Sequence, residues 1–146
     1  MHVKGTLYTD QAVFPYLKAA GGGTIVNFGS AAAIRGAQTY AVYGAAKGAV
    51  FAWTRNLAIE WGPHNIRVNA IAPFMKAACK GSRGRARPSR GECRMKGQRR
   101  SPRSAGTLGV AELDLAPMVC LLLGDGGTYI TGQVIAVDGG FAMLGS

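Results

Sequence analysis

Tyr43 and Lys47 are the side chains whose types and spacing are best suited to chemistry. They stand four residues apart in a segment expected to be helical, so both project from the same side, one turn apart. A nearby ammonium favours the phenolate form of a tyrosine, and such a phenol can exchange a proton with a substrate oxygen. Ser30 follows a predicted strand, where a hydroxyl can hydrogen-bond a reacting carbonyl oxygen. By itself, the pattern Tyr-x-x-x-Lys is weak evidence, and its meaning depends on the surrounding elements.

Three short apolar runs are typical of buried strands. They cover residues 24–28, 66–71 and 134–137. Helical spacing precedes the first run and separates the others, and apolar strands that alternate with helices predict parallel pairing with right-handed crossovers. The sequence therefore predicts an α/β fold.

The helices carry more specific expectations. Residues 3–17 have helical spacing, and Pro15 is expected to kink or end that helix. After a loop at 29–39, a long helix over 40–61 is expected to carry one apolar face, formed by Val42, Ala46, Ala49, Trp53, Leu57 and Trp61. A buried helix is expected within 113–123.

Composition narrows the class of protein. With 146 residues, 48% of them hydrophobic, the chain is about one domain long and is not expected to be globally disordered. Its longest apolar run, 115–123, is too short to cross a membrane, and the start of the chain lacks a signal-peptide pattern. Three cysteines without a C-x-x-C pair predict neither a disulfide framework nor a zinc site. We therefore expect a soluble, cytoplasmic protein without a metal.

Four motifs place the chemistry in a family context. These are TIVNFGS at 24–30, YAVYGAAKGAV at 40–50, NIRVNAIAP at 65–73, and YITGQ at 129–133 followed by VDGG at 137–140. Together they resemble the C-terminal half of a short-chain dehydrogenase/reductase, in the branch of 3-oxoacyl-[acyl-carrier-protein] reductases and glucose dehydrogenases. The resemblance implies a partial Rossmann-like parallel sheet, formed only by the C-terminal strands and helices of that fold.

The resemblance also implies roles for individual residues. Tyr43 would be the general acid/base, Lys47 would hold the nicotinamide ribose, and Ser30 would orient the substrate carbonyl. NAD or NADP would contact Tyr43, Lys47 and Pro73, and hydride would pass between the nicotinamide and a small carbonyl or alcohol substrate.

The sequence departs from the family pattern at several positions. The glycine-rich turn that cradles the pyrophosphate precedes these motifs in the family and is missing here, so we expect a truncated fragment that lacks activity alone. His2 stands where the family has an asparagine that supports a relay water, and we expect it to be frayed instead. Phe74 follows Pro73 where the family has a glycine.

A basic segment accounts for the net charge of +10. Residues 76–103 hold eleven of the seventeen Lys and Arg, and residues 76–106 contain no Leu, Ile, Val, Phe, Tyr or Trp. Such a segment cannot offset its ordering entropy by apolar burial, so we expect a disordered insert or an out-of-frame product. The resulting division is a partial Rossmann-like segment at 1–74, the basic segment at 75–109, and the closing helix and strand of the same domain at 110–146.

Alternatives to a simple inactive fragment stay open. The chain could be half of a split reductase that another chain completes, or a nucleic-acid-binding protein that uses the arginine-rich segment. The second is disfavoured, since no aromatic residue is interleaved for base stacking. We expect the three strands to be neighbours, with the backbone groups of one edge strand left unpaired. Such an edge predicts a weakly stable chain that tends to associate. The resemblance also allows a homo-oligomer through the two long helices.

Overall fold

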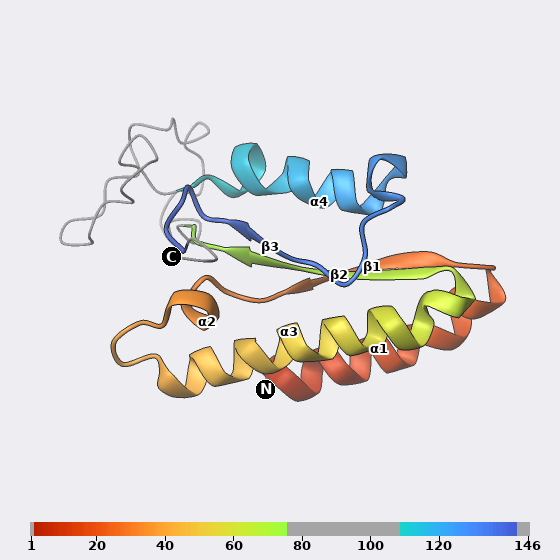
Figure 1. Ribbon diagram of the computed structural model, residues 1–146, viewed down its shortest axis with the longest axis horizontal. Helices are drawn as coiled ribbons and strands as arrows, with labels where there is room; N and C mark the ends of the chain where they lie inside the picture. Colours follow the sequence, from red (N-terminus) through yellow and green to blue (C-terminus); the bar gives the residue numbers. More distant parts are fainter. Residues whose placement is uncertain (1, 76–108, 143–146) are drawn as a thin grey trace, which may run out of the picture.

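The computed structural model describes residues 2–75 and 109–142, and most of the predicted basic segment lies outside them. The described residues form one three-stranded sheet with helices on both faces (Figure 1). The principal elements are α1 (His2–Ala19), β1 (Gly23–Phe28), α2 (Ala32–Arg35), α3 (Ala41–Trp61), β2 (Ile66–Pro73), α4 (Ala116–Leu123) and β3 (Val134–Val137). Short helical turns η1 (Gly62–His64), η2 (Ala111–Leu115) and η3 (Asp125–Gly127) connect them.

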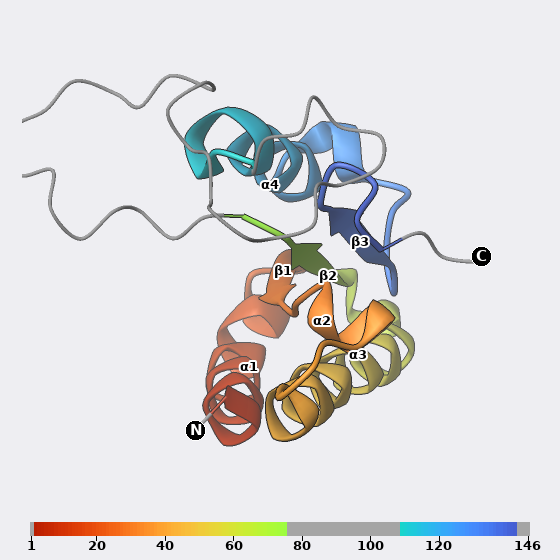
Figure 2. The ribbon, with the colours of Figure 1, turned by 90° about the vertical axis from the view of Figure 1, so that its left-hand side faces the viewer.

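All strand pairs are parallel, in the order β1-β2-β3. Gly23 pairs with Ile66 at the start of β1, and Ala70 pairs with Val134 at the start of β3. Parallel neighbours need long crossovers, and here α3 lies in the connection from β1 to β2 and α4 in the connection from β2 to β3. α1 and α3 lie on one face of the sheet and α4 on the other (Figure 2). The predicted α/β class and the neighbouring placement of the three strands are confirmed.

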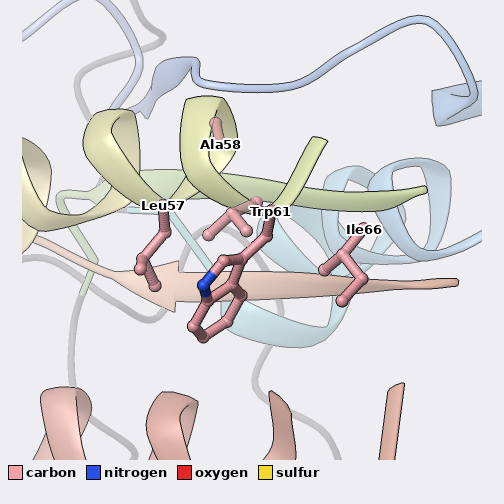
Figure 3. Close-up of a cluster of buried hydrophobic side chains, with 5 residues drawn as sticks. Leu57, Ala58, Trp61 and Ile66 are labelled. Carbon is pink, nitrogen blue, oxygen red and sulfur yellow. The ribbon is translucent and has the colours of Figure 1, made fainter. Parts of the chain in front are cut away.

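The main apolar core lies between α3, α1 and the sheet. Leu57, Ala58 and Trp61 of α3 gather with Ile66 and Val68 of β2 (Figure 3). The α1 residues Phe14 and Leu17 pack against this cluster, and the Phe14 ring stacks on that of Trp61 with centroids 4.5 Å apart. This layer of side chains fixes α1 and α3 beside each other.

The buried face of α3 differs from the predicted one. Leu57 and Trp61 are buried as expected, but Val42 is 86% exposed. The buried positions of α3 are Val50, Phe51, Thr54, Leu57, Ala58 and Trp61. The predicted stripe was partly wrong because the first two turns of α3 extend past the part of the sheet that the later turns cover.

Two further predictions about helices did not hold in full. Pro15 does not end α1, which continues to Ala19, with Phe14 and Leu17 packed against the core on both sides of the proline. The helix near 113–123 is not fully buried, because α4 is the one α-helix on its face of the sheet in the described part of the chain. Leu122 is buried, whereas Leu123 is 49% exposed.

A buried polar network joins α1, β1 and α3. Asp10 Oδ2 accepts hydrogen bonds from Asn27 Nδ2 at 3.0 Å and from Trp53 Nε1 at 2.8 Å. Asn27 Nδ2 also donates to Thr54 Oγ1 at 3.2 Å. Asp10, Asn27 and Thr54 are all buried, so these bonds satisfy groups that would otherwise be costly to remove from water. Burial raises the pKa of the Asp10 carboxyl above its ordinary 3.8, and the Asn27 and Trp53 donors act in the opposite direction.

We predict a pH signature for this carboxyl. The folded chain holds the Asp10 proton to higher pH than the unfolded chain does, so its free energy of unfolding falls as pH rises from 3.8 through the raised pKa, and then levels. Asp10→Asn removes this loss. Urea unfolding at a series of pH values should show the variant gaining on the wild type as pH rises above 3.8. A difference that stays constant, or that shrinks with pH, would contradict the burial of this group.

A second prediction concerns the core. Leu57 is 1% exposed, so Leu57→Ala should lower the free energy of unfolding by about 2–5 kcal/mol. Val42→Ala on the same helix is the matched control, since that side chain is exposed and its loss should change stability by less than about 0.5 kcal/mol. Equal effects in urea unfolding would mean that the buried face of α3 is misassigned.

Candidate active site

Lys47 is anchored at the carboxyl end of β1. Its Nζ donates a 2.7 Å hydrogen bond to the backbone carbonyl of Phe28, the last residue of the strand. The lysine comes from the second turn of α3, and the packing of the later turns against β2 sets the position of the helix. The ammonium is therefore held at Phe28, which precedes Ser30 by two residues in the sequence. This is the end of the sheet where ligands of parallel α/β folds bind.

The loop with Ser30 is tied to the end of β2. The Gly29 N–H donates to the Ile71 carbonyl at 2.8 Å, and the Ala31 N–H donates to the Pro73 carbonyl at 3.4 Å. A side chain at Gly29 would collide with the Phe51 ring, so the close approach of loop and helix requires glycine there. Pro73 and Ser30, predicted separately, thus come from neighbouring strand ends.

The Ser30 hydroxyl already has one partner. Its Oγ accepts a 3.2 Å hydrogen bond from the Ala32 N–H at the start of α2, the single helical turn that interrupts the predicted loop at 29–39. A hydroxyl has one hydrogen to donate in addition to its acceptor lone pairs. Ser30 can therefore donate to a substrate oxygen while it keeps this bond.

Tyr43 lies between two other aromatic rings. Its half-buried ring makes edge-to-face contacts with Tyr40, at 5.6 Å between centroids, and with His2, at 5.7 Å. Contrary to expectation, His2 is not frayed: it begins α1, and its ring reaches the tyrosine. The available signal was the resemblance, which implies an asparagine with a role in the site at the position of His2.

The three predicted catalytic residues share a region without bonding to one another. Within the described residues, no hydrogen bond joins the side chains of Ser30, Tyr43 and Lys47. The Lys47 ammonium bonds the Phe28 carbonyl rather than the phenol, which leaves two of its three N–H donors for another group. The arrangement places a cation and a hydroxyl at the carboxyl end of β1, and the phenol stands one helical turn from the cation.

A groove of about 470 Å³ begins beside this region. One wall is a face of α1 from His2 to Val13, the other is residues 24–28 of β1, and Lys47 lies at its end. Asp10 lines the groove although it is only 4% exposed. Sequence reasoning missed Asp10; an acidic residue on the same helical stripe as Phe14 and Leu17 was the available signal.

Two phenylalanine rings pack together beyond the ends of β2 and β3. The Phe74 ring stacks on that of Phe141 at 3.8 Å, with an interplanar angle of 7°. The Arg35 guanidinium lies 4.8 Å from the Phe141 ring centroid and donates to the Phe141 carbonyl at 3.2 Å. This stack connects α2 to the segment after β3, next to Pro73.

Three further features of the described residues concern metal ligands, membrane spans and cysteines. It contains no group of three or more His, Cys, Asp or Glu that could hold a metal ion. None of its helices is long and apolar enough to cross a membrane. Cys120, the one cysteine in these ranges, is exposed and unpaired.

Comparisons with known proteins agree with the fold. The sequence profile of the family described as enoyl-(acyl carrier protein) reductase matches residues 1–142. A tropinone reductase homolog of Arabidopsis thaliana is 37% identical over 144 residues, which cover 99% of this chain and 53% of that protein. The chain thus spans about half the length of the curated relatives it matches.

Solved structures agree as well. The acetoin dehydrogenase of Salmonella typhimurium superposes with a TM-score of 0.81 at 28% identity, covering 96% of this chain and 53% of that one. A 3-ketoacyl-(acyl-carrier-protein) reductase of Brucella melitensis, solved with NADH, gives a TM-score of 0.78 at 28% identity and covers 97% and 55%. The chain belongs to the short-chain dehydrogenase/reductase family.

Proposed function

We propose that this chain is the catalytic half of an NAD(P)-dependent oxidoreductase that acts on a small carbonyl or alcohol, and that it is inactive alone. The observation that carries the proposal is the bond from Lys47 to the Phe28 carbonyl. It holds the cation at Phe28, the carboxyl end of β1, two residues before Ser30 in the sequence. Lys47 and Tyr43 stand one turn apart on α3.

Each residue has a role that its surroundings support. Tyr43 exchanges a proton with the substrate oxygen, and Ser30 donates its free hydroxyl hydrogen to the same oxygen. Lys47 supplies positive charge, and its remaining N–H donors suit the hydroxyls of a ribose. Pro73 would border the nicotinamide, since the Ala31–Pro73 bond brings it beside the Ser30 loop.

The described residues fit only one end of a dinucleotide. In residues 2–75 and 109–142, no strand leads through a cluster of glycines into a helix of more than four residues, so the phosphates find no cradle there. When bound, NAD(P) supplies the hydride chemistry. We therefore propose that the pyrophosphate site comes from elsewhere. We keep the cytoplasm as the proposed location, because the cysteine pattern suits a reducing compartment.

A split reductase is the second candidate function. It would account for the match to about half the length of the relatives, which for one of them has a TM-score of 0.81. The nucleic-acid alternative rests on residues outside the described part of the chain and gains nothing from it.

The test joins the catalytic half to a cofactor half covalently. We define the complementary part as the segment of the Salmonella typhimurium acetoin dehydrogenase that the structural match leaves uncovered. Fused in front of this chain, it should give NAD(P)H-dependent reduction of small diketones. Tyr43→Phe should lower kcat by about 10²–10⁴-fold, because the proton donor is lost.

Two controls make the result specific. Tyr40→Phe removes the hydroxyl of the neighbouring ring, 50% exposed, and should leave kcat within about twofold. The unfused chain should show no saturable change in nicotinamide fluorescence. Equal losses in Tyr40→Phe and Tyr43→Phe, or full activity in Tyr43→Phe, would refute the assigned roles.

A further inference from the structure

The stacked rings of Phe74 and Phe141 lie where β2 and β3 end. Phe74 directly follows Pro73, the last residue of β2, and its N–H donates at 3.2 Å to the carbonyl of Val137, the last residue of β3. All three strands are parallel, so the two rings lie at the same end of the sheet as the Ser30 loop.

Asp138 holds the turn that carries Phe141. Its Oδ1 accepts a hydrogen bond from the Gly140 N–H at 2.9 Å, and its Oδ2 accepts one from the Ala142 N–H at 2.7 Å. Its backbone carbonyl also accepts from the Phe141 N–H, at 3.3 Å. Three bonds to one residue fix the turn, so the Phe141 ring offers a stable surface to other side chains.

Arg35 makes two different contacts with Phe141. Its guanidinium lies 4.8 Å from the ring centroid, and its Nη1 donates to the backbone carbonyl at 3.2 Å. A planar guanidinium can stack on a ring and donate hydrogen bonds at its edge, which an ammonium does less well. Residues 35–42 are all exposed, so burial does not hold the chain after α2. The Arg35 contacts attach the end of this helix to the segment after β3.

α2 is held differently on its inner side. Ala33 and Ile34 pack against a buried cluster that includes Phe51. Apolar packing has no preferred direction, so it fixes the depth of α2 over the sheet better than its rotation. The directed bond from Arg35 fixes that rotation.

These contacts form a closed path beside Ser30. The Arg35 N–H donates to the Ala31 carbonyl at 3.0 Å, and the Ala31 N–H donates to the Pro73 carbonyl at 3.4 Å. Pro73 leads into the two stacked rings, which return the path to the Arg35 guanidinium. The 3.4 Å bond is long, so by itself it holds the Ser30 loop weakly. The Arg35 side chain gives the loop a second attachment.

We propose that Arg35 is a positioning residue for Ser30. By holding α2 against the segment after β3, it keeps the Ala32 N–H on Ser30 Oγ, the 3.2 Å bond that directs the hydroxyl. The hydroxyl hydrogen then stays free to donate to the substrate oxygen. Arg35 acts on the reaction only through Ser30. The proposal rests on the proposed function, because that function gives Ser30 its role.

Amide hydrogen exchange of the full chain tests the attachment without any activity. Arg35→Gln should speed exchange of the Ala31 and Ala32 amides about tenfold, the effect of losing one hydrogen bond to a charged group. The Val68 amide, in the buried part of β2, should be unchanged. Arg55→Gln is the matched control: it removes another exposed arginine, on α3, and should exchange like the wild type.

Two more variants probe the same contacts. Phe141→Leu removes the ring while it keeps Arg35, so it should also speed exchange of the Ala31 and Ala32 amides, and it serves if Arg35→Gln does not fold. Arg35→Lys keeps the charge without the planar group and should fall between Arg35→Gln and the wild type. Circular dichroism of each variant separates unfolding from a local change.

A double-mutant cycle in the covalent fusion separates positioning from a general structural role. Arg35→Gln should lower kcat about tenfold and leave the KM for NAD(P)H unchanged, because one hydrogen bond to the substrate oxygen is misdirected. In a Ser30→Ala background the hydroxyl is already lost, so Arg35→Gln should have no further effect on kcat. An equal loss of kcat in both backgrounds would overturn the positioning role.

The outcomes distinguish this proposal from the proposed function. Unchanged exchange of the Ala31 and Ala32 amides in Arg35→Gln overturns the positioning role, whatever the fusion does. Faster exchange of these amides, together with a fusion that reduces no carbonyl, supports the attachment of the Ser30 loop by Arg35 and removes the proposed function.

Discussion

The central strand β2 is the constraint on which the rest of the structure depends. It pairs in parallel with β1 on one edge and β3 on the other, and its residues from Val68 to Ala72 are all buried. A parallel strand in this position needs helices on both faces to cover it and to return the chain. α3 covers β2 on one face of the sheet, whereas α4 lies on the other face and packs mainly against β1.

The candidate site follows from the same constraint. Parallel strands bring their carboxyl ends to one edge of the sheet, which is why the Ser30 loop and Pro73 become neighbours. The core contacts of α3 hold its early turns beside that edge. Lys47 then links α3 to the end of β1 through its hydrogen bond to the Phe28 carbonyl. Residues far apart in the sequence therefore meet because of the strand order and need no contact among their own side chains.

The order and type of most helices and strands could be predicted from the sequence, because local patterns of apolar, glycine and proline residues determine where they begin and end. The strand at 134–137 and the helix ending at Trp61 are confirmed, since apolar runs and the Gly62-Pro63 stop act locally. The partial exposure of α4 and the shifted face of α3 could not be predicted, because both depend on how far the sheet extends over each helix. Asp10 was missed because its partners, Asn27 and Trp53, are distant in the sequence.

The assignment of 75–109 as a separate basic segment stays a prediction. Only its flanking residues, Met75 and Gly109, are described, and these form a single parallel bridge.

The central claim is that, within the described residues, β1 pairs with β2 alone and that its carboxyl end carries the proposed catalytic side chains. Residue-resolved amide hydrogen exchange of the isolated chain tests it directly. The Ile25 and Asn27 amides, which face β2, should exchange much more slowly than those of Thr24 and Val26, which face the groove. Equal protection of all four amides would contradict the account, because β1 would then be paired on both edges or on neither.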